Sequence, residues 1–413
     1  MSDFRAAAAL PQEDWAEAPA YEDAQPPADS LRFRDLLSAP TLTGFADVGV
    51  VLLFVRGLNV GFGLSRTLLL WYAFMTVAKL SLLVISWNRR APLTGPAKWM
   101  IGSTIAMALA TTVTGIGSFT PYLAVAAFVI NLTLSSMLIG QGPIWRYLLG
   151  PLLVIAGSAA YHAFLCLDHR MPIWWGRYLY FGYNQFNLGG EIEAIGCLAA
   201  ALILPRILAL PVLAVILFDM SKMQTRAAML VGFCAIVVIL LFDGRRRLSG
   251  ARAAVLLVLG LIGGVLVIAV GSGGLSDAAS SLFLLNDPHR GIETGGSGRS
   301  DLWQWSLVLF EQSPLVGHNL GYFESVGFIG SHNMILYGLA QYGLMSMLFV
   351  GSLIYGFASL ARQNLHRFAV LCCALPLLLF NDRFTNLNPY PFIFFVLLSA
   401  AVVDRRGAPA AVG

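Results

Sequence analysis

The amino-acid sequence predicts an all-α, polytopic membrane protein with about twelve transmembrane helices, and three observations support this fold class. Hydrophobic residues make up 57% of the 413 residues and charged residues only 12%. Soluble domains carry about 25% charged residues, so this chain has too little polar surface to face water. Apolar runs of about 20 residues, the length that crosses a hydrocarbon core as a helix, recur along the chain. Finally, the basic loops between these runs agree with one orientation in the membrane.

Twelve apolar segments are candidate spans. They are Thr43–Leu58, Thr67–Trp87, Lys98–Thr114, Pro121–Ile139, Tyr147–Leu167, Leu188–Leu204, Leu208–Phe218, Ala227–Phe242, Ala253–Gly271, Asn333–Leu360, Phe368–Phe380 and Pro391–Val403. The chain then divides into a tail (1–40), nine spans (41–271), a large loop between the ninth and tenth spans (272–332), three spans (333–403) and a second tail (404–413).

Loop charges predict that both ends of the chain are cytoplasmic. With the N-terminus inside, every strongly basic short loop falls on the inner side, as the positive-inside rule requires. These loops carry Asn88-Arg89-Arg90, Arg146, Arg206, Arg245-Arg246-Arg247 with Arg252, Arg362 to Arg367, and Asp404-Arg405-Arg406. Residues 1–40 hold eight acidic residues and three arginines, which predicts a disordered acidic tail.

The long loop at 272–332 is predicted to lie outside and to be partly folded. Loops longer than about 15 residues are usually functional or disordered, and the tryptophans of this loop favour order. Asp301 followed by Gln304 resembles a capping box, so we expect a helix over Asp301–Gln312 at the membrane interface. Ser331 is expected to cap the next spanning helix, with His332 and Asn333 in its first turn.

Arginines on the external side indicate an anionic substrate that arrives through lipid. Arg226 lies in a polar interruption between two short apolar runs, and such interruptions are tolerated where the backbone lines an enclosed cavity. Arg177, Arg290 and Arg299 belong to external loops. Because guanidinium groups bind phosphate in a bidentate manner, a lipid diphosphate fits this set. The alternatives are an arginine that snorkels to the headgroups and ordinary ion pairs with external acids.

His332 is a candidate general base, because the positive end of a helix dipole favours a neutral imidazole. The alternative is an ordinary polar residue at a helix start. We expect no metal site. The five cysteines lie in apolar runs without metal-ligand spacing, and the chain has no P-loop, no Asp-x-Asp pair and no H-E-x-x-H. The nearest acidic pair is Glu191-Ile192-Glu193.

One set of motifs resembles the O-antigen ligase and O-antigen polymerase family. The main motif runs Ser297-Gly298-Arg299, Trp303, Pro314-Leu315-Val316-Gly317, Gly321, Ser331-His332-Asn333, Leu336 and Gly343-Leu344. Gln224-Thr225-Arg226-Ala227-Ala228 resembles a second element of the family, and Tyr183-Asn184-Gln185-Phe186-Asn187 a third. The similar part covers roughly 170–350. Thr225 stands where serine is usual and Gln185 where proline is commoner, which bears on the subgroup.

The resemblance implies a GT-C-like, metal-independent glycosyltransferase of the bacterial inner membrane without a cofactor. Its donor would be an undecaprenyl-diphosphate-linked glycan, and the large loop would be periplasmic. Carried over by position, Arg226 and Arg299 would hold the diphosphate and His332 would deprotonate or position the acceptor hydroxyl. Arg177 would be a third cation, with Arg290, Trp303 and Asn333 as further substrate contacts.

Three functions remain open from the sequence. The leading hypothesis is a polymerase that extends lipid-linked O-antigen or exopolysaccharide, and the nearest alternative is a ligase that transfers the glycan to lipid A-core. The third, from another class, is a lipid-linked glycan transporter or flippase. Transporters commonly contain interrupted helices in matching positions of the two halves, whereas the interruption near Arg226 has no counterpart in the first half of this sequence. Expected partners are membrane lipid, the glycan or lipid A-core acceptor, a chain-length regulator and a flippase, with no nucleic acid.

Overall fold

The computed structural model describes residues 36–55, 63–117, 119–174, 176–182, 186–241, 295–328, 330–379 and 389–401. The structure is mostly helical, with 81% helix and 2% strand, which confirms the all-α class. Several predicted features lie outside the described residues: the acidic tail at 1–35, the ninth span Ala253–Gly271, the first part of the large loop and the tail at 404–413.

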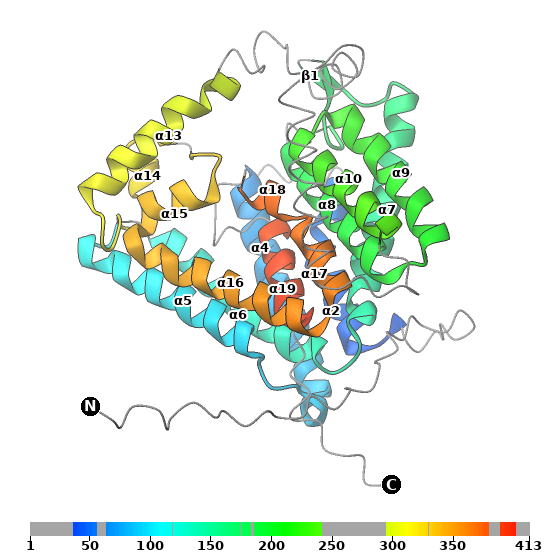
Figure 1. Ribbon diagram of the computed structural model, residues 1–413, viewed down its shortest axis with the longest axis horizontal. Coiled ribbons are helices and arrows are strands. Elements are labelled where there is room, and N and C mark those ends of the chain that lie inside the picture. The colour runs from blue at the N-terminus through cyan, green and yellow to red at the C-terminus, as the bar shows by residue number, and fades with distance from the viewer. Residues whose placement is uncertain are drawn as a thin grey trace, which may run out of the picture. The chain divides into compact units, whose positions relative to one another are not determined.

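The N-terminal part of the bundle extends to Leu167 and the hairpin that follows it (Figure 1). Its elements are α2 (Ala39–Val48), α3 (Val50–Val55), α4 (Gly63–Ile85), η1 (Trp87–Arg89), α5 (Gly95–Thr111), η2 (Thr112–Thr114), α6 (Phe119–Ile139) and α7 (Ile144–Leu167). A two-stranded antiparallel hairpin follows, β1 (Ile173–Trp174) and β2 (Arg177–Tyr178), with Trp174 opposite Arg177.

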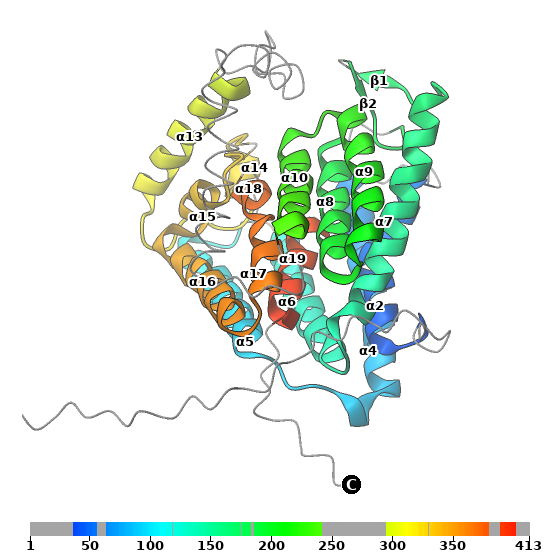
Figure 2. The ribbon, with the colours of Figure 1, turned by 45° about the vertical axis from the view of Figure 1, so that its right-hand side comes forward.

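The C-terminal part begins with three helices joined by short corners (Figure 2). They are α8 (Phe186–Ile203), α9 (Arg206–Met223) and α10 (Arg226–Leu241). After the large loop come α13 (Gly295–Gln312), α14 (Tyr322–Ser325), α15 (Met334–Tyr342), η4 (Gly343–Met345), α16 (Ser346–Gln363), α17 (Leu365–Cys372), α18 (Leu375–Leu379) and α19 (Pro389–Ala401).

Helices occupy the predicted spans within the described residues, but three of the spans are divided, among them Phe368–Phe380, which is shared between α17 and α18. The first, Thr43–Leu58, is divided into α2 and α3 at Gly49, where a Cβ atom would lie 2.4 Å from the Trp71 ring. The span Asn333–Leu360 is divided by the turn at Gly343, whose φ is 59°. The hydropathy pattern of the sequence does not reveal such breaks, because the segments on both sides of each break are apolar.

Three helices in the described part of the chain are long and apolar enough to cross a membrane: Phe119–Ile139, Ile144–Leu167 and the composite Met334–Gln363. Shorter apolar helices cover Leu69–Ile85, Arg226–Leu241 and Leu365–Leu378. The total of twelve spans therefore stays a prediction. Large apolar side chains such as Ile85, Val113 and Ile207, which are 77–83% exposed, cover the outside of the bundle. A lipid environment explains such surfaces, which water disfavours.

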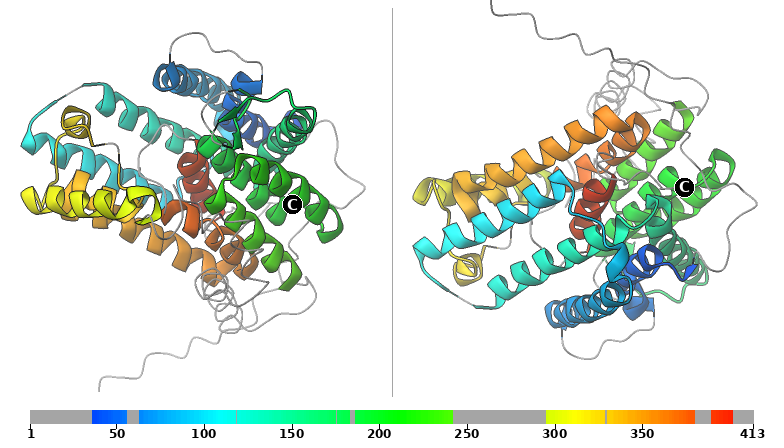
Figure 3. Two further views of the ribbon diagram at one scale, coloured as in Figure 1. Left: turned by 90° about the horizontal axis from the view of Figure 1, so that it is seen from above. Right: turned by 90° about the horizontal axis from the view of Figure 1, so that it is seen from below.

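The most buried helix is α19, in which the side chains from residue 391 to residue 399 are all buried. It contacts α5, α6 and α16 and also α8 and α2, so it lies between two groups of helices (Figure 3). Phe395 makes edge-on ring contacts with Phe128 of α6 and Phe349 of α16. The α7–α10 group packs pairwise on one side of this centre, and the α13–α15 pair packs beyond α5 and α16.

Candidate functional site

The helix with the Ser297-Gly298-Arg299 motif is joined to the segment that carries the His332-Asn333 motif. The indole Nε1–H of Trp303 donates a hydrogen bond of 2.9 Å to the carbonyl oxygen of Ser331. Behind it, Leu309 of α13 packs with Phe323 and Phe328 in a small apolar cluster. The two halves of the main motif therefore fold as one unit, which we call the α13–α15 unit.

Two motif glycines allow the chain to turn tightly inside this unit. At Gly317, φ is +70° and a Cβ atom would lie 2.2 Å from the carbonyl oxygen of Gln341. At Gly343, φ is +59° and a Cβ atom would lie 2.6 Å from the carbonyl oxygen of Pro314. Leu344 N–H donates to the same Pro314 oxygen at 2.8 Å. Side chains at either glycine would be both strained and in steric conflict, so the Pro-Leu-Val-Gly segment and Gly343 form one backbone contact.

Asn333, rather than Ser331, caps the following helix, which corrects one expectation. The Asn333 side-chain oxygen accepts hydrogen bonds from the N–H groups of Ile335 and Leu336, and α15 begins at Met334. The Ser331 hydroxyl instead donates to the Asn333 carbonyl oxygen at 2.7 Å. His332 is half-buried, with a left-handed φ of 48°, and lies just before the helix instead of in its first turn. An asparagine is at least as good a cap as serine. Ser331 and Asn333 flank His332 on either side, and the structure uses Asn333 as the cap.

The α13 helix ends at Gln312 as predicted but begins at Gly295, six residues before Asp301. Asp301 is therefore an interior residue of the helix, and the predicted capping box at Asp301 and Gln304 is wrong. Glycine costs about 1 kcal/mol in a helix interior, so the Gly-rich stretch from residue 295 to residue 298 concealed the earlier start. Arg299 lies in α13 four residues before Trp303, and Arg290 lies outside the described residues.

A second group of predicted residues meets where α9 turns into α10. Gln224 ends α9 in a left-handed conformation, with φ 54°, and its side-chain amide donates to the Gly176 carbonyl oxygen at 3.1 Å. Gly176 forms the turn of the β1–β2 hairpin, next to Arg177. Arg226 is the first residue of α10, and both arginines are half-buried. The hairpin and the helix corner thus bring Arg177 and Arg226 to one end of the bundle.

These two groups are built from different elements. The N-terminal end of α13 and the β1–β2 hairpin lie toward the same end of the molecule in both views (Figures 1 and 2).

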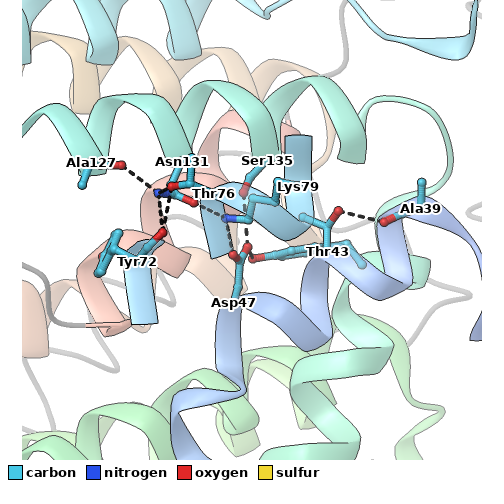
Figure 4. Close-up of polar contacts among 10 residues, drawn as sticks. Ala39, Thr43, Asp47, Tyr72, Thr76, Lys79, Ala127, Asn131 and Ser135 are labelled. Carbon is cyan, nitrogen blue, oxygen red and sulfur yellow. Dashed lines mark hydrogen bonds and ion pairs between the residues drawn. The ribbon is translucent and has the colours of Figure 1, made fainter. Parts of the chain in front are cut away.

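Sequence reasoning missed a buried ion pair within the helices (Figure 4). Lys79 of α4 and Asp47 of α2 are fully buried and form a salt bridge. Asp47 also accepts hydrogen bonds from the Tyr147 hydroxyl at 2.9 Å and from the Ser135 hydroxyl at 3.3 Å. Lys79 also donates to the Asn131 side-chain oxygen at 3.2 Å. A lone lysine within an apolar run was the available signal, since such residues are rare and paired. We call this set the α2–α4 network.

It also missed a buried group where α7, α8 and α9 meet. His162 Nδ1 lies 2.8 Å from an Asp219 oxygen, and Cys166 Sγ lies 3.8 Å from the same nitrogen. Glu193 is fully buried close by, and its strongest electrostatic interaction is with Asp219. Tyr180, just after β2, packs over His162 with ring centroids 5.4 Å apart. Burial, and then the carboxylates of Glu193 and Asp219, raise the pKa of the Tyr180 phenol well above its usual value.

Comparison with known proteins adds no identification. The chain matches no family model and no curated protein.

Proposed function

We propose that this chain is a glycosyltransferase of the bacterial inner membrane that polymerises polyprenyl-diphosphate-linked oligosaccharides at the periplasmic face. It would span the membrane about twelve times with both ends cytoplasmic. The motif resemblance motivates the proposal. The observation that carries it is the hydrogen bond from Trp303 to Ser331, because it fixes the Arg299 helix to the His332 segment.

The proposed reaction follows from the chemistry of these residues. The acceptor hydroxyl oxygen attacks the anomeric carbon of the donor, forms the new glycosidic bond, and transfers its proton to the His332 imidazole. The bond between that carbon and the diphosphate oxygen breaks, and the diphosphate leaves with the electron pair. Arg226 and Arg299 would stabilise the negative charge that grows on the leaving group. Positioned guanidinium groups suit this task because they stay charged at any physiological pH.

Positions near His332 support this assignment of roles. His332 is half-buried, so it has access to an acceptor, and its backbone is held by the Asn333 cap on one side and the Trp303 contact on the other. A left-handed residue at φ 48° is strained for a side chain with a Cβ atom. Such strain commonly occurs at functional sites, where the surrounding structure enforces it.

The test uses purified protein in liposomes supplied only with the polyprenyl-diphosphate oligosaccharide. A ladder of longer lipid-linked products would support a polymerase. Transfer that occurs only after lipid A-core is added would make the protein a ligase. Translocation of a labelled lipid that is unaffected by His332→Ala, without transfer, would contradict the enzyme proposal and favour a flippase.

Arginine variants test the site itself. Arg226→Ala should abolish transfer, and Arg206→Ala should not. Arg206 is the matched control, because it is the first residue of α9 as Arg226 is the first residue of α10. Normal product from Arg226→Ala, Arg299→Ala or His332→Ala would remove that residue from the proposed site.

A further inference from the structure

The fully buried residues His162, Cys166, Glu193 and Asp219 contain two carboxyl groups, and only Asp219 has a basic partner. Cys166 is 1% exposed and the other three are fully buried or nearly so. His162 Nδ1 pairs with Asp219 at 2.8 Å, and in the described part of the chain no lysine or arginine pairs with either carboxyl group. Two carboxylates that face each other in a low dielectric repel strongly unless a proton or a cation lies between them.

Glu193 is the least satisfied member of this group. Neither of its carboxylate oxygens makes a hydrogen bond of standard geometry although the side chain is fully buried, and Asp219 is the neighbouring side chain that could share a proton with it. Its strongest electrostatic interaction is with Asp219, so the carboxylate faces the cluster rather than lipid. Buried polar atoms are nearly always satisfied in native proteins, and an unsatisfied one calls for an unseen partner such as an ion.

The histidine is oriented as a metal ligand would be. His162 Nε2 lies 3.1 Å from the backbone carbonyl oxygen of Leu179, which can only accept a hydrogen bond. This contact places a hydrogen on Nε2 and turns Nδ1 toward the two oxygens of Asp219, at 2.8 and 3.0 Å, while Cys166 Sγ lies 3.8 Å from each ring nitrogen. Metal-binding histidines typically donate their other N–H to a carbonyl or carboxylate in this way.

Three of the four proposed ligands lie close together. The ligand atoms of His162, Cys166 and Asp219 all lie within 4.8 Å of one another. Bonds of about 2.0–2.3 Å to a tetrahedral zinc ion separate the ligand atoms by about 3.3–3.8 Å. The N–S distance of 3.8 Å lies at the upper end of that range, whereas the N–O distance of 2.8 Å is a hydrogen-bond length and lies below it. Side-chain shifts of less than about 1 Å would therefore accommodate the ion.

We infer that His162, Cys166, Glu193 and Asp219 bind a divalent transition-metal ion of the zinc class. Imidazole, thiol and carboxylate together form a borderline-soft set that such ions favour over magnesium or calcium. A divalent cation would neutralise two of the three negative charges that two carboxylates and a Cys166 thiolate carry, and a proton retained on Glu193 would neutralise the third. His162 and Cys166 lie four residues apart on one face of α7, and α8 and α9 each supply one carboxylate.

The place of the site in the fold suggests a structural role for the ion. Gly190, one turn before Glu193, lets α8 touch Thr225, where an added Cβ atom would lie 2.6 Å from the Thr225 side chain. Thr225 is the residue before Arg226. An ion that ties α7, α8 and α9 together would therefore hold the helix corner that presents Arg226. The inference rests on the cluster alone and does not depend on glycosyl transfer.

The experiment measures metal directly in tag-free full-length protein purified in detergent. After chelation, Zn²⁺ or Co²⁺ is added, excess ion is removed, and bound metal is counted by mass spectrometry. We expect one ion per chain, and for Co²⁺ the near-ultraviolet charge-transfer band of a thiolate ligand. Cys166→Ser should remove this band, and Glu193→Gln should weaken binding at least tenfold. Cys372→Ala, which alters another buried cysteine, should leave both readouts unchanged.

Two results would overturn the inference. One is wild-type protein that binds no more metal than Cys166→Ser, which would mean that protons alone neutralise the carboxylates. The other is binding to both variants at the wild-type level, which would locate the ion elsewhere. If Glu193→Gln does not fold, the comparison of wild type with Cys166→Ser still decides, because sulfur to oxygen is a nearly isosteric change.

Discussion

The two buried charged groups of this bundle differ in how their charges are satisfied. In the α2–α4 network, Asp47 and Lys79 neutralise each other, and surrounding hydroxyl and amide groups complete their hydrogen bonds. In the cluster of His162, Cys166, Glu193 and Asp219, His162 pairs with Asp219, whereas the Glu193 oxygens make no hydrogen bond of standard geometry and interact most strongly with the like-charged Asp219. The first arrangement is complete as a structural element, whereas the second is complete only with a cation or a proton. Burial alone therefore does not indicate function, and the unsatisfied group is the more informative one.

The largest predicted effect comes from breaking the complete pair. Lys79→Met leaves Asp47 buried and unpaired, which should lower the free energy of unfolding by about 3–5 kcal/mol. Thermal unfolding in detergent measures this, with Lys98→Met, at an exposed lysine, as the control. The double variant Asp47→Leu with Lys79→Met should recover most of the loss. A single variant as stable as wild type would show that the pair does not hold the helices together.

An intermediate effect is expected at the edge of the same network. Asn131 accepts a hydrogen bond from Lys79 and donates to the Thr76 hydroxyl at 2.8 Å and the Ala127 carbonyl oxygen at 2.9 Å. Asn131→Ala removes these contacts and leaves Lys79 with one acceptor fewer. We expect a loss of about 2 kcal/mol in the free energy of unfolding, measured in the same way. A loss equal to that of Lys79→Met would mean that the amide, and not the ion pair, is the main contributor.

Glu193→Gln should change the free energy of unfolding less than the variants of the α2–α4 network do. The sign of this change distinguishes that network from the cluster that contains Glu193. With a chelator present, removing one of two facing carboxylates should raise the free energy of unfolding by about 1 kcal/mol. With Zn²⁺ present, the variant should gain less stability from the ion than wild type. Unfolding curves with chelator and with metal provide the comparison. A loss of several kcal/mol in chelator would show that Glu193 is paired after all, and the contrast with Asp47 would fail.

The smallest effect is expected at the cysteines outside both groups. Cys372 packs as an apolar side chain in α17, so Cys372→Ala should change stability by about 1 kcal/mol or less. Bound metal, measured by mass spectrometry, should be unchanged. A large loss of metal in this variant would place the site near α17 instead of α7.

Much of the helical architecture could be predicted from the sequence, because apolar runs of helical length are a strong local signal. The ends of α6, α7 and α13 agree with prediction at Ile139, Leu167 and Gln312. The breaks at Gly49 and Gly343 could not be predicted, because they depend on the contacts with Trp71 and Pro314. Apolar periodicity carries no information about such tertiary contacts.

The candidate site was predictable in part. Motif spacing identified Trp303 and the Ser331-His332-Asn333 segment, which the structure brings together through one hydrogen bond. The choice of Asn333 as the cap depended on local geometry that spacing does not determine. The cluster of His162 with Glu193 and Asp219 was missed, because its members come from three helices and only the packing of those helices joins them.

The most direct test of the central claim compares two tryptophans of α13 in the liposome transfer assay. Trp303 donates the hydrogen bond to Ser331 that joins the two motif segments, whereas Trp305 packs edge-on against Phe328 at 5.1 Å. Loss of one such hydrogen bond should raise the activation free energy of transfer by about 1 kcal/mol, which lowers the rate roughly fivefold. The account predicts that Trp303→Phe slows transfer at least about fivefold and that Trp305→Phe leaves it near the wild-type rate. Equal rates for both variants and wild type would contradict a single site built from these two segments.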